Sequence, residues 1–137
     1  MGLILDTSIL VRAERHDLPI ARVLQQLQQF GPDQETGISS VTVAELAHGI
    51  YRAASETQRQ RRSAFLDQVC KEIIVQPLTE SIARLLGRIE GEQAAQGISI
   101  AFEDLAIGAT ALALGFSVAT HNIRHFQLIP GLVVLTL

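Results

Sequence analysis

Residues Gly2–Leu10 read GLILDTSIL, a short apolar run that leads into one acid, two hydroxyl residues and a second apolar stretch. A short, continuous apolar run is typical of a strand buried on both faces in the middle of a parallel sheet. Asp6 would then lie at the carboxyl end of this strand, the edge where open α/β sheets bind ligands. The alternative role of Asp6 is to cap the helix that follows.

The rest of the chain alternates between helical periods and short apolar runs. We expect helices over residues 8–13, 20–30, 57–72, 80–96 and 101–114, with another from about residue 41. We expect strands over residues 36–39, 73–75, 116–120 and 132–135. Strands separated by helices throughout indicate a parallel α/β fold with right-handed crossovers. Gly108 is expected to let the apolar helix over 101–114 lie close to the sheet.

Composition narrows the class of protein. The 137 residues match one domain, residues 1–137, and 47% apolar content is enough for a core. A net charge of −3 gives no general basic footprint, so a nucleic-acid partner needs a local basic patch or a metal ion. The single cysteine, Cys70, excludes an internal disulfide, and its apolar neighbours predict a core thiol. Neither a signal peptide nor a membrane span is predicted, so we expect a cytoplasmic location and no membrane contact.

Three acids stand out because their predicted positions converge. Asp6 ends the first strand, while Glu45 and Asp104 fall in the first turns of helices that follow strands or pack on the sheet. Crossover helices of a parallel sheet would bring all three to one edge, where Asn122 also arrives. Local alternatives exist: a capping box with Thr42 for Glu45, the helix dipole for Asp104 and a turn for Asn122.

Oxygen ligands of this kind suit Mg²⁺ or Mn²⁺ better than zinc. A water bound to such an ion becomes a usable nucleophile, and the ion neutralises charge on a phosphoryl oxygen. The set therefore favours metal-dependent hydrolysis of a phosphodiester. His121 and His125 stand four residues apart, a spacing that binds zinc on a helix, but no further zinc motif supports that alternative.

Four blocks in this order resemble the PIN-domain ribonucleases of the VapC toxin type. The blocks are Leu5–Ser8, Val43–Gly49, Glu103–Ala111 and Thr120–Leu132. The resemblance extends over nearly the whole chain. It implies a single PIN-like (Rossmann-like) domain of the α/β class, with about five parallel strands in the order 3-2-1-4-5 flanked by helices.

The resemblance also implies a function. It implies an endoribonuclease that cuts a structured RNA, a tRNA or an rRNA, with a water activated by Mg²⁺ or Mn²⁺. Asp6 and Asp104 would hold the metal with help from Glu45, and Asn122 would complete the catalytic set. A homodimer and a small VapB-like antitoxin partner are implied as well.

The resemblance extends to residues around the acids. Thr7 and Thr120 match hydroxyl positions that would orient acids or waters. Arg124 and Arg12 are candidates for contacts with RNA phosphates. Many PIN domains have aspartate where this chain has Asn122, and an amide contributes no charge. A PIN-like module that binds RNA or a partner without cleaving therefore remains the alternative function.

Overall fold

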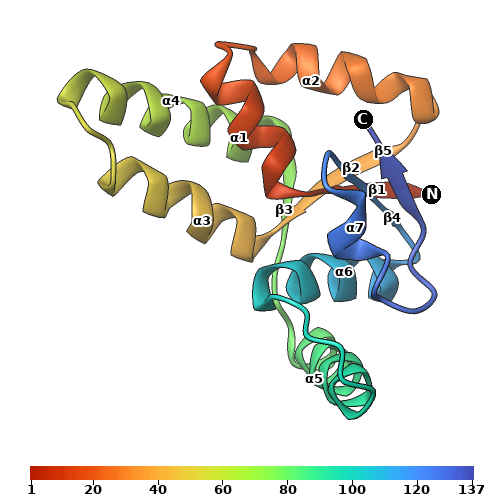
Figure 1. The fold of residues 1–137 in the computed structure, drawn as a ribbon. Coiled ribbons are helices and arrows are strands. Elements are labelled where there is room, and N and C mark those ends of the chain that lie inside the picture. Colours follow the sequence, from red (N-terminus) through yellow and green to blue (C-terminus); the bar gives the residue numbers. More distant parts are fainter.

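A five-stranded, all-parallel sheet forms the centre of the molecule (Figure 1). The computed structural model describes all residues, 1–137, and orders the strands β3-β2-β1-β4-β5. This confirms the predicted fold and strand order. The strands are β1 (Gly2–Leu5), β2 (Glu35–Ser39), β3 (Ile74–Gln76), β4 (Ser117–Thr120) and β5 (Val134–Thr136).

The first strand is central and buried on both faces, as its apolar run predicts. Leu3 and Leu5 belong to one hydrophobic cluster and Ile4 belongs to the other, because successive side chains of a strand point to opposite faces. Each of the three is at most 1% exposed. The strand pairs with β2 on one side and with β4 on the other, so its carboxyl end lies in the middle of the sheet edge.

Helices cover both faces of the sheet (Figure 1). The cluster that contains Leu3 is covered by α1, α2 and α4, and the cluster that contains Ile4 by α5, α6 and α7. The helices are α1 (Thr7–Arg15), α2 (Ile20–Leu27), α3 (Ser40–Tyr51), α4 (Glu56–Glu72), α5 (Glu80–Ala95), α6 (Phe102–Leu114) and α7 (Ile123–Phe126), with a 3₁₀ turn at Gln28–Phe30. No helix is both long and apolar enough to cross a bilayer.

Several helix ends agree with their local signals. Thr79 caps α5 by accepting a hydrogen bond from the Ile82 amide, and Gly115 ends α6 in a left-handed conformation at φ +70°. The short helix α7 was not predicted, because four residues are too few to show a helical period.

Two packing predictions were wrong. Cys70 is exposed, because Val69 and Ile73 face the core and Cys70 lies about 100° further round the helix. The helix α6 does pack against the sheet, as predicted, but Gly108 makes room for the segment after α7: a Cβ there would collide with Ile129.

Candidate active site

Asp6 lies at the carboxyl end of β1, buried to 6% exposure. It occupies the N-cap position of α1, but its side chain makes no capping hydrogen bond. Instead its Oδ2 accepts two hydrogen bonds of 2.7 Å, from the hydroxyls of Ser8 and Thr120. The carboxylate is thus held by hydroxyls from α1 and β4, not by the backbone N–H groups of α1, and the capping alternative for Asp6 was wrong.

Thr120 connects this acid to the segment that carries Asn122. Its hydroxyl, fully buried, donates to Asp6 and accepts the backbone N–H of Asn122 at 2.8 Å. Asn122 is exposed and begins α7, and its side chain does not cap that helix. The backbone of Asn122 is therefore fixed next to the acids, while its amide group points into a solvent-accessible region.

Glu45 reaches the same edge from α3. The helix begins at Ser40, with Ser39 as its cap, so Glu45 lies in the second turn and not in the first. The capping box with Thr42 was also wrong, because Thr42 is buried against Thr7, with 2.9 Å between the two hydroxyls. Thr7 donates to Glu45 Oε1 at 2.9 Å. The residue that follows Asp6 therefore orients the second acid.

Asp104 lies in the first turn of α6, as predicted, and is partly buried. The Nδ1 atom of His125, on α7, lies 3.4 Å from its Oδ2. The other histidine, His121, has its Nδ1 atom 3.0 Å from the Leu137 carbonyl. The two histidines have separate contacts and do not share a helix, so the zinc-pair alternative was wrong.

Burial and neighbouring carboxylates raise the pKa of two of the acids, Glu45 and Asp104. Burial raises the pKa of Glu45 above its ordinary value, the hydrogen bond from Thr7 lowers it, and the charges of Glu103, Asp6 and Asp104 raise it again. Burial followed by the charge of Asp6 raises the pKa of Asp104. Both shifts have the same physical cause: these carboxylates are partly desolvated and share one electrostatic field. A cation between them would relieve that repulsion.

The donor set fits a hard divalent cation that keeps water ligands. Its oxygens come from carboxylates, which Mg²⁺ and Mn²⁺ prefer. No three His, Cys, Asp or Glu side chains are close enough to form a complete protein ligand set. Mg²⁺ commonly binds through one or two carboxylates and several waters, so it does not need a complete set of protein ligands.

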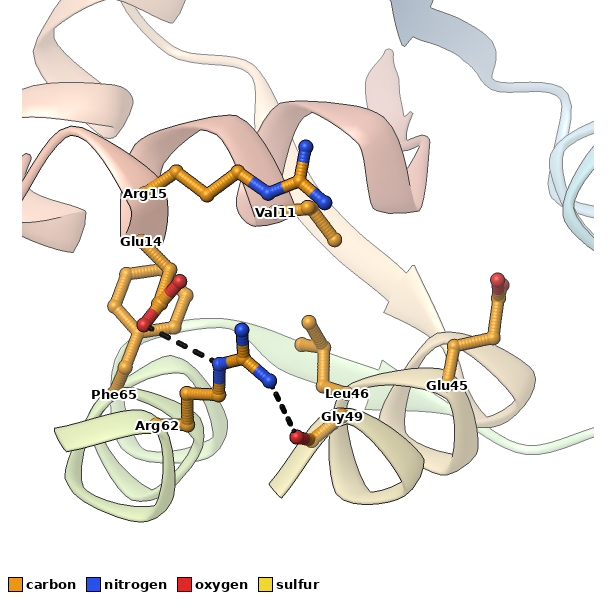
Figure 2. A pocket seen from close by; sticks show the side chains of 8 residues that line it. All are labelled: Val11, Glu14, Arg15, Glu45, Leu46, Gly49, Arg62 and Phe65. Carbon is orange, nitrogen blue, oxygen red and sulfur yellow. Dashed lines mark hydrogen bonds and ion pairs between the residues drawn. The ribbon is translucent and has the colours of Figure 1, made fainter. Parts of the chain in front are cut away.

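A cavity adjoins the acids between α1, α3 and α4 (Figure 2). Its volume is about 180 Å³, and Glu45 is one of the residues that line it. Arg62 lines it, with its Nε 3.7 Å from Glu14 Oε1 and its Nη1 2.6 Å from the Gly49 carbonyl. The Arg62 side chain is only 25% exposed and links three helices.

The arginines expected to contact RNA remain at the surface. Arg12 and Arg124 are exposed and form no ion pair. Both belong to elements that border the acids, Arg12 to α1 and Arg124 to α7. Their guanidinium groups are free to bind phosphate.

Sequence reasoning gave no role beside the acids to Ser8 or Glu103, and considered His125 only as half of a zinc pair. Ser8 lies two residues after Asp6 and Glu103 lies directly before Asp104, so closeness in sequence was an available signal. His125 had no such signal, because its contact with Asp104 depends on how α7 packs beside α6.

Comparison with known proteins identifies the family of this chain. The family model described as PIN domain matches residues 3–132. Ribonuclease VapC1 of Rickettsia felis is 33% identical over 136 residues, covering 99% of this chain and 96% of that relative. Ribonuclease VapC of Rickettsia bellii is 29% identical over the same shares.

Solved structures give the same result. The structure of VapBC2 from Rickettsia felis bound to a DNA fragment from their promoter contains a chain that superposes with a TM-score of 0.83 at 25% identity, covering 99% of this chain and 98% of that one. VapBC-1 from nontypeable Haemophilus influenzae gives a TM-score of 0.82 at 25% identity, with the same coverage. The chain therefore belongs to the PIN-domain family, as a member of the VapC type.

Proposed function

We propose that this chain is a metal-dependent endoribonuclease and the toxin of a VapBC-type toxin–antitoxin pair. The observation that carries the proposal is the group of acids Asp6, Glu45 and Asp104 at the carboxyl edge of the sheet. Two of them have pKa values raised by burial and by the charges of their neighbours. The relatives named Ribonuclease VapC, similar over 99% of the chain, support RNA as the substrate.

Asp6 and Asp104 would hold Mg²⁺ or Mn²⁺, with Glu45 bound directly or through a water. When bound, the cation supplies a water of lowered pKa and neutralises charge on the phosphoryl oxygen. The chain supplies orientation: hydroxyls hold Asp6 from two sides, and Thr7 holds Glu45. Fixing acids in this way raises the affinity and the geometric definition of a metal site.

The substrate we propose is a structured RNA, a tRNA or an rRNA. Arg12 and Arg124 would contact its phosphates, because they are exposed, unpaired and on elements that border the acids. Because the chain has a net charge of −3, RNA binding would depend on these local cations and on the metal ion. Asn122, exposed at the same edge, would contribute an amide to a water or a phosphate.

The partners we propose are a VapB-like antitoxin and a second copy of this chain. The structural neighbours were solved as VapBC assemblies, which supports the antitoxin. The cavity in Figure 2 has apolar and charged walls and reaches Glu45, so a segment seated there would block access to the acids. Exposed apolar side chains, among them Tyr51 at 77% and Ile74 at 60%, offer surface for a homodimer.

Cleavage of RNA by the purified chain, free of antitoxin, tests the proposal. We expect discrete cuts in Mg²⁺ or Mn²⁺, no cuts in EDTA, and a loss of about two orders of magnitude or more in Asp104→Asn. Asp67→Asn is the matched control, because Asp67 is an exposed acid on α4 away from the edge. Equal cleavage by the Asp104 variant would refute the site. Metal binding without any cleavage would favour the non-cleaving module.

A further inference from the structure

One imidazole contacts an acid of the candidate metal site. His125 Nδ1 lies 3.4 Å from Asp104 Oδ2. Two ligands at right angles on an octahedral cation, with bonds of about 2.1 Å, lie about 3 Å apart. We propose that His125 is a ligand of the divalent cation, beside Asp104, and that it biases the site toward a transition-metal ion such as Mn²⁺ over Mg²⁺. This inference rests on the proposed function.

Buried groups set the position of His125. Its backbone N–H donates to the Asn122 carbonyl, and the Asn122 N–H donates to Thr120, whose hydroxyl holds Asp6. The next residue, Phe126, is fully buried and anchors α7 in the core. The imidazole is therefore presented to Asp104 from a fixed backbone, although 58% of its side chain is exposed.

The proposed preference for Mn²⁺ over Mg²⁺ follows from the chemistry of the ligands. Carboxylates and water suit Mg²⁺ and Mn²⁺ alike, whereas imidazole nitrogen favours first-row transition ions. In a site that otherwise offers carboxylate and water oxygens, one imidazole nitrogen would shift the preference toward such ions. The competing interpretation is an ordinary surface ion pair between His125 and Asp104, which would contribute about 1 kcal/mol or less to stability and no ligand.

Pulsed EPR of Mn²⁺ bound to the complete chain tests the proposal directly. We expect coupling of Mn²⁺ to an imidazole ¹⁴N in the wild type, and its loss in His125→Asn. His121→Asn is the matched control, because the His121 ring contacts the Leu137 carbonyl, and it should keep the coupling. Calorimetric titration should show Mn²⁺ affinity about tenfold lower in His125→Asn. Mg²⁺ affinity should change little.

Three results would overturn the inference in different ways. In the first, Mn²⁺ binds to the wild type without nitrogen coupling, and Asp104→Asn abolishes the binding. His125 would then be a neighbour of the site and not a ligand, and the proposed function would stand. Equal weakening of Mn²⁺ and Mg²⁺ by His125→Asn would mean that the histidine acts only by orienting Asp104. Mn²⁺ binding that Asp104→Asn does not change would refute both the inference and the proposed metal site.

Discussion

Replacing Thr120 with valine removes the one hydroxyl that joins β4 to the acid at the end of β1. The Thr120 side chain is fully buried and donates to Asp6 Oδ2 at 2.7 Å. It also accepts the Asn122 N–H at 2.8 Å. Valine has nearly the same shape but no hydroxyl, so the substitution tests the hydrogen bonds with little change in packing.

The expected cost follows from the charge of the acceptor. A hydrogen bond to an ionised group contributes about 1.5–3 kcal/mol to stability, against about 1 kcal/mol for a neutral pair. Ser8 still donates to the same oxygen, so Asp6 keeps one donor. We therefore expect Thr120→Val to lower the free energy of unfolding by about 2 kcal/mol, or the melting temperature by about 6–8 °C.

Urea denaturation of the metal-free chain measures this loss, with Thr110→Val as the matched control. Thr110 is also fully buried and donates at 2.7 Å, but to the Ala106 carbonyl within α6. That carbonyl also accepts a backbone hydrogen bond within the helix, so losing the bond from Thr110 should lower the free energy of unfolding by about 1 kcal/mol or less. Thr120→Ser keeps the hydroxyl and should keep the Mn²⁺ affinity, whereas Thr120→Val should lower it about tenfold.

Equal losses in Thr120→Val and Thr110→Val would show that the charge on Asp6 adds nothing to the contact. Unchanged Mn²⁺ affinity in Thr120→Val would show that the hydroxyl does not orient Asp6 for a metal. Either result would refute the reasoning that this buried threonine prepares the site.

Three further predictions concern charge and backbone. The pKa values of Glu45 and Asp104 are raised in the folded state, so the folded state binds more protons than the unfolded state over the pH range above the ordinary carboxyl pKa. The metal-free chain should therefore lose stability as pH rises through that range. Saturating Mg²⁺ should flatten the dependence of melting temperature on pH. Arg62→Ala should lower the free energy of unfolding by about 1–2 kcal/mol, measured in urea, because it leaves the buried Glu14 carboxylate with only the half-exposed Arg61 and removes the hydrogen bond to the Gly49 carbonyl. Arg84→Ala breaks an exposed pair and should change the same free energy by about 0.5 kcal/mol or less; equal effects would contradict this account. Gly87→Ala should raise stability by about 0.5–1 kcal/mol by the same measurement, since Gly87 is exposed in α5 and a Cβ there meets nothing within 4 Å; a loss would show an unseen packing constraint.

Much of the fold could be predicted from local pattern. The apolar run before Asp6, the alternation of strands with helices, and the helix signals at Thr79 and Gly115 all agree with the structure. The predictions that failed concern what each side of a helix packs against. Cys70 has apolar neighbours in sequence yet faces solvent, and Gly108 accommodates a later loop and not the sheet.

The sequence by itself determined which residues could form the site and roughly where each lies on its element. Asp6 and Asp104 could be placed because a strand end and a first helical turn are local features. Only the tertiary structure decided what each acid contacts. Thr120 reaches Asp6 across 114 residues and Thr7 reaches Glu45 across 38, and His125 meets Asp104 through helix packing. Such contacts depend on strand register and helix placement, which are set by the whole core, whereas periodicity and capping act over only a few residues.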